Sequence, residues 1–168
     1  KTTADPFDGK LSYVKVLNGT FNSDSQLINA SKNESERVAQ VLVVTGKSQE
    51  STVALAPGDI GAVAKLNSAL TGDTLSSKET PLVLPRIDFP NPVYQMAAFP
   101  TSKADTDKMS NALARITEED PCLSVTREPD TYEVLLGGLG DTHIDVTVEK
   151  MKRKFGVDIS LQTPKVPY

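Results

Sequence analysis

The chain has 168 residues and a formal net charge of −4; 38% of its residues are hydrophobic and 5% are aromatic. This composition is typical of a globular protein with a mainly aliphatic core, in one large domain or two small ones, and excludes a disordered chain. The acidic balance also excludes a protein that coats nucleic acid nonspecifically, since such proteins are usually basic, so any RNA contact is expected at a local patch.

The first half of the chain carries the signals of short β-strands. The run LSYVKV at residues 11–16 alternates in character and precedes Asn18-Gly19, a dipeptide typical of hairpins. Further short apolar or alternating runs lie at residues 25–30, 37–46 and 51–56. Residues 61–66 could form a strand or a short helix, but the flanking turn signals PGDI and TGD favour a strand. Many short strands at this spacing predict a small all-β barrel over residues 1–80.

A proline-rich segment follows, PLVLPRIDFPNP at residues 81–92. Four prolines in twelve positions are incompatible with a helix or a central strand. We expect a stiff, extended linker and a domain boundary here.

The spacing of hydrophobic residues changes in the second half of the chain. Strand-like runs lie at residues 93–99, 123–128, 131–136 and 157–162. A helix is predicted over residues 102–120, with Met109, Leu113 and Ile116 on one face and Ser102 or Asp105 as its cap. A second helix is predicted from Asp141 to Gly156. Its apolar stripe consists of Ile144, Val148, Met151 and Phe155. The order β-α-β-β-α-β predicts an α+β ferredoxin-like domain over residues 93–168.

The turn GGLGDTHIDV at residues 137–146 holds three glycines, two aspartates and His143, the only histidine. Glycines before a helix can bind phosphate, but this turn lacks the lysine and hydroxyl of a nucleotide loop. The spacing i, i+2, i+4 of Asp141, His143 and Asp145 could hold a metal on a strand, whereas on a helix His143 points elsewhere. We favour a structural interpretation in which the glycines allow close packing and Asp141 caps the helix. His143 then either packs on a neighbour or makes a functional contact.

Charged residues mark the ends of both predicted helices. Lys150, Lys152, Arg153 and Lys154 close the second helix, where they either complement its dipole or contact RNA phosphates. Glu118, Glu119 and Asp120 end the first helix, where the dipole disfavours them, so either solvent or a nearby cation or partner is expected to stabilise them.

Cys122 is the only cysteine, which excludes an intrachain disulfide or a cysteine-built metal site and fits a reducing cytoplasm. No apolar run approaches the roughly 20 residues that a membrane-spanning helix needs, so we expect no membrane partner. The first residues resemble no signal peptide, and Lys1 is not an initiating methionine, so the natural chain is expected to begin upstream. We expect the chain itself to be monomeric.

An ordered set of motifs resembles elongation factor G. DPFDGKL at the N-terminus, ERV at residues 36–38, the PGDI turn and TGDTL at residues 71–75 resemble its second domain. FPNPV, KADTDKM, EEDP and GLGDTHID resemble its third domain, in the same order along the chain. The resemblance implies a translational GTPase in which a β-barrel lies against small-subunit ribosomal RNA and a ferredoxin-like domain contacts the small subunit and relays the nucleotide state.

The resemblance also implies that this chain is a middle segment of a longer protein. It has no phosphate loop and no Asn-Lys-x-Asp motif, so GTP and Mg²⁺ are expected to bind an upstream domain. We therefore expect no enzymatic activity, cofactor or metal in the chain itself. Its expected partners are the RNA and protein of the small ribosomal subunit and the GTPase domain of the whole protein, which would use GTP hydrolysis to move tRNA and mRNA.

Five residues match the family's interdomain pocket for the antibiotic fusidic acid: Asp120, Cys122, Leu139, Thr142 and His143. The family usually has G-M-G-E-L-H-L where this chain has GLGDTHI, and often threonine where Cys122 stands. These departures suggest a diverged paralogue with weak fusidic acid sensitivity. Alternative interpretations are a ribosome-protection or back-translocation GTPase, a stand-alone RNA- or protein-binding module, and a small hydrolase with a metal at DTHID.

Overall fold

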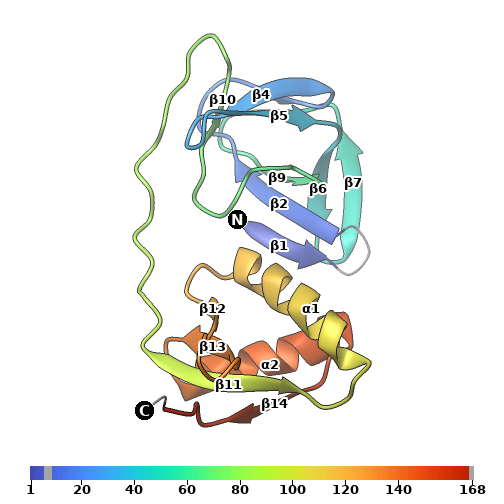
Figure 1. Ribbon diagram of the computed structural model, residues 1–168. Helices are drawn as coiled ribbons and strands as arrows, with labels where there is room; N and C mark the ends of the chain where they lie inside the picture. The colour runs from blue at the N-terminus through green and yellow to red at the C-terminus, as the bar shows by residue number, and fades with distance from the viewer. Residues whose placement is uncertain (6–8, 167–168) are drawn as a thin grey trace. The chain divides into compact units, whose positions relative to one another are not determined.

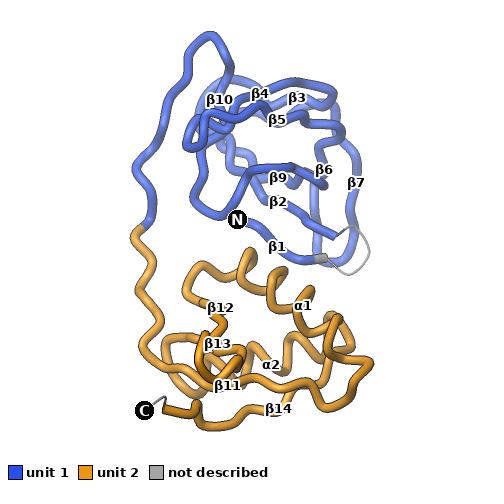
Figure 2. The backbone as a smooth tube through the Cα atoms, in the orientation of Figure 1, with its two compact units in different colours: residues 1–87 blue, residues 88–168 orange. Residues whose placement is uncertain are grey.

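The computed structural model describes residues 1–5 and 9–166, so part of the DPFDGKL motif lies outside the described residues. The chain divides into two compact units, residues 1–87 and 88–168 (Figure 2). Residues 77–93 between the last strand of the first unit and the first strand of the second contain no helix or strand.

The first unit is built only from β-strands in its described part (Figure 1). The strands are β1 (Thr2–Asp5), β2 (Gly9–Lys15), β3 (Phe21–Asn22), β4 (Ser25–Asn29), β5 (Glu34–Val38), β6 (Val41–Thr45), β7 (Ser48–Thr52), β8 (Ala54–Leu55), β9 (Ile60–Ala64) and β10 (Leu75–Ser76). They form sheets with the orders β1-β2-β9-β6-β7, β10-β4-β5 and β3-β8. The predicted β-barrel is confirmed, including a strand at residues 60–64.

The barrel core is aliphatic, as the composition suggests. Val38, Val41 and Val63 are completely buried, and Leu55 and Leu66 pack with them. These side chains come from β5, β6, β8, β9 and the residues after β9, so strands of different sheets pack around one core. Burial of such side chains is the main favourable term in folding.

Two details of the first unit differ from the sequence predictions. Asn18-Gly19 does not join a hairpin, because β2 pairs with β1 and β9 on its two edges while β3 pairs with β8. The run at residues 37–46 is two strands, β5 and β6, separated at Ala39 and Gln40. The hydroxyl of Ser23 accepts a hydrogen bond from the Val41 N–H at 2.9 Å and so supports the chain just after this break.

The second unit has the predicted β-α-β-β-α-β order (Figure 1). Its elements are β11 (Tyr94–Pro100), α1 (Asp105–Glu119), β12 (Ser124–Arg127), β13 (Val134–Gly138), α2 (Asp141–Phe155) and β14 (Ile159–Gln162). The four strands form one antiparallel sheet in the order β12-β13-β11-β14. This topology is that of a ferredoxin-like domain and confirms the prediction.

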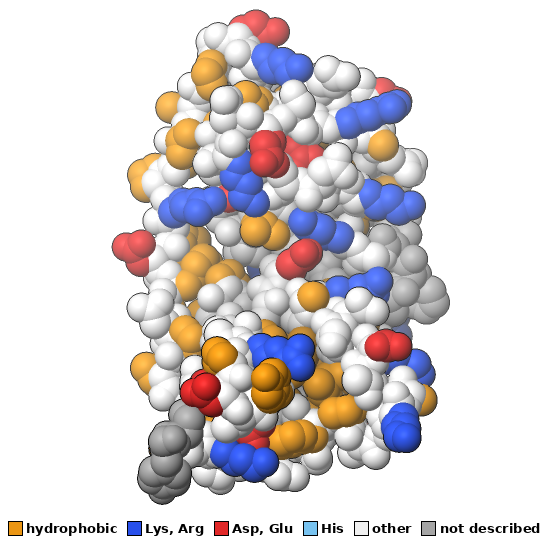
Figure 3. All heavy atoms as spheres, in the orientation of Figure 1, with side chains coloured by type: hydrophobic (Ala, Val, Ile, Leu, Met, Phe, Trp, Pro, Cys, Tyr) orange, Lys and Arg blue, Asp and Glu red, His pale blue; other side chains and the backbone are white. Residues whose placement is uncertain are grey.

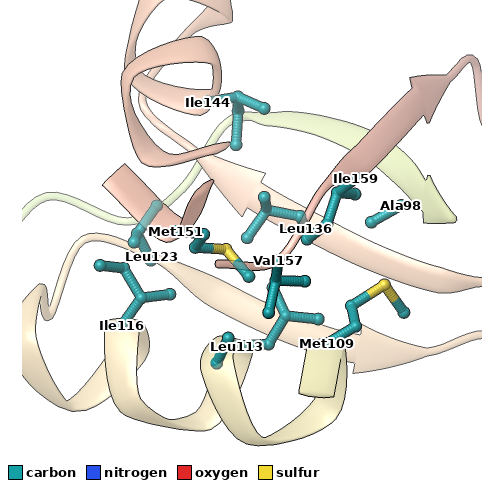
Figure 4. Packing of buried hydrophobic residues seen from close by; sticks show 11 residues of the cluster. Ala98, Met109, Leu113, Ile116, Leu123, Leu136, Ile144, Met151, Val157 and Ile159 are labelled. Carbon is teal, nitrogen blue, oxygen red and sulfur yellow. The ribbon is translucent and has the colours of Figure 1, made fainter. Parts of the chain in front are cut away.

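The two helical stripes predicted from periodicity form the core of this unit (Figure 4). Met109, Leu113 and Ile116 of α1 are 1–4% exposed, and Ile144 and Met151 of α2 are completely buried. Val148 and Phe155 pack against the same cluster. Figure 4 shows the α1 side chains directed toward Met151, Leu136 and Val157, so helices and sheet share one core.

The start of α1 and the caps of both helices differ from the predictions, whereas α2 begins at Asp141 as predicted. Ala104 occupies the cap position of α1, and the Ser102 hydroxyl lies 2.6 Å from the Asp105 carboxylate without capping the helix. Gly140 occupies the cap position of α2, and Asp141 is its first helical residue. The predicted end of α2 is confirmed, because Gly156 adopts a left-handed conformation (φ 63°) and its N–H donates to the Lys152 carbonyl.

Candidate functional site

The turn between β13 and α2 is packed closely around its glycines. A Cβ on Gly138 would lie 2.9 Å from the Ile144 side chain and 3.0 Å from Nδ1 of His143. A Cβ on Gly137 would lie 2.3 Å from the Ser124 hydroxyl. Glycine at these two positions therefore lets β13 approach both the neighbouring strand and the first turn of α2. The predicted role of both residues in close packing is confirmed.

His143 connects this turn to the end of α1. Its Nδ1 accepts a hydrogen bond from the Leu139 N–H at 3.0 Å, and its Nε2 lies 2.9 Å from Oδ2 of Asp120. Because Nδ1 accepts this hydrogen bond, Nε2 carries the ring hydrogen and donates it to the carboxylate. Neutral His143 therefore satisfies both contacts and bridges Leu139, just before α2, and Asp120, just after α1.

Four of the five predicted pocket residues belong to this hydrogen-bonded group. The second oxygen of Asp120 accepts a hydrogen bond from the Cys122 N–H at 2.9 Å, so Asp120 joins Cys122 to His143, which in turn holds Leu139. Thr142 stands apart, since its N–H and hydroxyl both donate to the Asp141 carboxylate. The side chains of His143 and Asp120 are 21% and 32% exposed, so the group is accessible at its edge.

The geometry of the turn does not support a metal site formed by Asp141, His143 and Asp145. Asp141, His143 and Asp145 lie on a helix, and the ring of His143 is turned toward Asp120 rather than toward either aspartate. Within residues 1–5 and 9–166, no group of three or more His, Cys, Asp or Glu side chains is arranged to hold a metal ion.

The basic cluster at the end of α2 pairs largely within its own unit. Lys154 lies 2.9 Å and Lys150 lies 4.0 Å from the carboxylate of Glu119, and Lys152 lies 3.3 Å from that of Asp158. Glu119 is the nearly buried acid at the end of α1, so Lys154 provides the nearby cation that the sequence suggested. Lys152 and Arg153 are the exposed members of the cluster. On the face drawn in Figure 3, basic side chains are interspersed with acidic and uncharged ones.

Two buried carboxylates in the barrel were not singled out from the sequence. Glu36, in the ERV motif, is 1% exposed and accepts hydrogen bonds from the N–H groups of Asn67, Ser68 and Ala69 and from the Ser68 hydroxyl. Burial alone would raise the pKa of Glu36, but these hydrogen bonds outweigh it and hold the pKa below its ordinary value. Glu36 lies two positions before Val38 in β5, on the face of the strand that Val38 buries in the core, and this alternation is the sequence signal for a buried role.

Asp73, in the TGD turn, has a side chain that is 1% exposed. Its Oδ2 accepts hydrogen bonds from the Asn29 amide and the Leu70 N–H, both at 3.0 Å, and lies 3.4 Å from Lys32. Its Oδ1 pairs with Arg86. Burial again acts to raise the pKa of Asp73, but these hydrogen bonds and the two cations outweigh it and lower the pKa.

A β-barrel followed by a ferredoxin-like domain places the chain in the translation-factor class. Two family matches identify it further. Residues 1–78 match the family described as elongation factor G domain 2, and residues 89–163 match the one described as elongation factor G, domain III. The chain therefore belongs to the elongation factor G family and comprises its second and third domains.

A solved structure supports the same assignment. The chain is similar to a protein in a crystal structure from Thermus thermophilus, with 29% sequence identity and a TM-score of 0.85. The match covers 99% of this chain and 25% of that protein, so the chain spans about a quarter of the relative's length. Neither matched domain is the GTP-hydrolysing domain of the family. In the described residues, no helix is both long enough and apolar enough to cross a bilayer.

Proposed function

We propose that this chain is the ribosome-contacting and relay segment of an elongation-factor-G-like GTPase in the cytoplasm. The whole protein would bind GTP and Mg²⁺ in an upstream domain and couple hydrolysis to movement of tRNA and mRNA. The observation that carries the proposal is the ordered match of both units to the second and third domains of the family. The barrel would contact small-subunit RNA, and the ferredoxin-like unit would contact the small subunit and the GTPase domain.

Within the α2 cluster, Lys152 and Arg153 are the residues best suited to contact RNA phosphates. Both are exposed at the end of the helix, whereas Lys150 and Lys154 pair with the nearly buried Glu119. All four remain candidates, but reversing the charge of Lys154 would also place two acids together and disturb the fold. A test of RNA binding is therefore cleaner at Lys152 and Arg153.

The test is sedimentation of the chain with purified bacterial small ribosomal subunits, comparing the unaltered chain with Lys152→Glu plus Arg153→Glu. If this patch contacts phosphates, the double variant loses affinity and its binding depends less on salt concentration. Lys103→Glu plus Lys108→Glu is the matched control, because it reverses two exposed charges of the same unit. Equal loss in both variants, or in neither, would contradict a specific phosphate contact at this patch.

The Asp120–His143 group is proposed to line the fusidic acid pocket, with Cys122, Leu139 and Thr142. The polar Thr142 stands where the family usually has leucine, which removes apolar contact with the drug and adds a hydroxyl that needs a partner. The whole protein is then a diverged paralogue with weak drug sensitivity. Thr142→Leu in the whole protein is expected to increase inhibition by the drug, and strong inhibition of the unaltered protein would contradict this proposal.

A sister function remains the second candidate. Ribosome-protection and back-translocation GTPases resemble elongation factor G in this pair of domains, and the departures GLGDTHI and Cys122 are compatible with such a specialised member. A translocation assay with the whole protein distinguishes them: forward movement of tRNA and mRNA supports the translocase, and its absence despite ribosome-dependent GTP hydrolysis supports the specialised role.

A further inference from the structure

The first half of the proline-rich segment is fastened to the barrel. The N–H of Leu84 donates a hydrogen bond to the hydroxyl of Thr74 at 3.1 Å, and the guanidinium of Arg86 pairs with Asp73. Asp73 and Thr74 directly precede β10, so the chain leaves the barrel through β10, turns, and returns beside the residues it came from (Figure 1). Residues 81–87 accordingly belong to the compact first unit.

One end of this attachment is rigid. The carboxylate of Asp73 is held from three further directions, by the Asn29 amide, the Leu70 N–H and Lys32, and it is almost completely buried. Asn29 itself is completely buried. The acceptor for Arg86 is therefore positioned by the barrel whether or not Arg86 is present.

The other end can open. The side chain of Arg86 is 56% exposed, and its neighbours Leu82, Val83 and Ile87 are 54–68% exposed. Only Leu84, at 37% exposure, is substantially covered, so the returning segment buries little apolar surface and two polar contacts fasten it to the barrel. Such a segment opens at much lower free-energy cost than the barrel core.

The next fixed point along the chain is in the second unit, where the Val93 N–H donates to the Gly138 carbonyl at 2.9 Å. In the described part of the chain, no hydrogen bond involves residues 88–92. With Arg86 in place, these five residues are the connection between the units and span roughly 16 Å when extended. With Arg86 and Leu84 released, residues 81–92 become the connection and span roughly 40 Å.

We infer that Arg86 and Asp73 form a latch that sets the length of the joint between the two units. Closed, the latch restricts the joint to residues 88–92; open, it lengthens the joint to the whole proline-rich segment and widens the range of orientations the units can adopt. The inference does not rest on the proposed ribosome binding, because all of the latch contacts lie within the first unit.

Amide hydrogen exchange of the 168-residue chain tests the latch at single residues. In Arg86→Ala, exchange at the Leu84 N–H is expected to accelerate at least tenfold, while exchange at the Val93 N–H stays unchanged because its acceptor lies in the second unit. Arg86 is chosen over Asp73 because loss of the buried carboxylate would disturb the barrel itself. Arg37→Ala is the matched control, since Arg37 is exposed on β5 and has no ion pair among the described residues.

The joint itself is tested by the distance distribution between two spin labels, at Ser48→Cys on β7 and Ser110→Cys on α1, in a Cys122→Ser background. Arg86→Ala is expected to broaden this distribution, and Arg37→Ala is expected to leave it unchanged. High salt should broaden the distance distribution in the unaltered chain, because Arg86 is exposed and its ion pair with Asp73 is therefore screened by salt. Unchanged Leu84 exchange, or an unchanged distribution despite faster exchange, would overturn the inference.

Discussion

His143 is the residue whose structural role can be tested most simply. Replacing it with alanine leaves the Leu139 N–H and the Asp120 carboxylate without the ring that connects them. We expect His143→Ala to lower the free energy of unfolding by about 1 to 2 kcal/mol, a modest value because the group is partly exposed. Urea denaturation monitored by circular dichroism measures this. Thr142→Ala, one position away, loses only an exposed contact to Asp141 and should change stability much less. Equal losses of stability would show that the hydrogen bonds of His143 to Leu139 and Asp120 contribute nothing specific to folding.

Tyr132 has an unusual backbone conformation for a large residue. Its φ is 59°, in the left-handed region, its side chain is 72% exposed, and its ring lies 5.8 Å from the Arg127 guanidinium. A left-handed conformation costs about 1 to 2 kcal/mol for a residue with a Cβ. We expect Tyr132→Gly to be more stable than Tyr132→Ala by about 1 kcal/mol, because both lose the ring and only glycine relieves the backbone. Thermal unfolding of the pair decides this, and equal stabilities would argue against strain at this turn.

The bonding partners of single residues were the least predictable feature. The sequence singled out Asp120 and His143 through a resemblance, but nothing local in it pairs them, since they meet only when the sheet brings the end of α1 to the start of α2. The sequence placed Asp73 in a turn and no more. Its buried position depends on Asn29, Lys32 and Arg86, which come from two other segments: the end of β4 with the turn after it, and the proline-rich segment.

At the scale of elements, Glu119 and Lys154 brace the ends of α1 and α2. Their side chains are 10% and 22% exposed and lie 2.9 Å apart. Because removing one partner leaves a mostly buried charge, Lys154→Met is expected to cost about 1 to 3 kcal/mol of unfolding free energy. Lys152→Met, which breaks an exposed pair with Asp158, should cost less than about 1 kcal/mol. Chemical denaturation of both variants under one protocol makes the comparison, and a smaller loss for Lys154→Met would contradict the brace.

Helices and strands with a regular spacing of hydrophobic residues were predicted well, whereas the positions of their ends were predicted less well. The stripe Ile144, Val148, Met151 and Phe155 predicted α2, and Gly156 predicted its end, because both signals are local. The start of α2 at Asp141 was predicted correctly, but α1 begins three residues later than predicted, and neither Asp105 nor Asp141 caps its own helix. The hairpin predicted at Asn18-Gly19 was wrong because strand pairing depends on which edges β1 and β9 already occupy.

At the scale of the whole molecule, the barrel should lose stability in acid. Glu36 and Asp73 both have lowered pKa values in the barrel. Since their folded pKa values lie below the ordinary values near 4, their ionised forms stabilise the barrel fully above about pH 4.5. That contribution is lost as the pH falls through the folded pKa values. Amide exchange between about pH 2.5 and 6 should show the barrel opening in acid. The variant Glu36→Gln should be less stable than Glu34→Gln near pH 6, and its stability should fall less as the pH is lowered. Parallel pH profiles for these two variants would contradict the assignment.

Binding to the ribosome is tested by quantitative sedimentation of the 168-residue chain with small ribosomal subunits over a series of salt concentrations. We expect saturable binding that weakens as salt rises, because contacts to RNA phosphates release counterions. We also expect competition by an authentic bacterial elongation factor G. Binding that is absent at low salt, or that the factor does not displace, would contradict the proposed role of this chain.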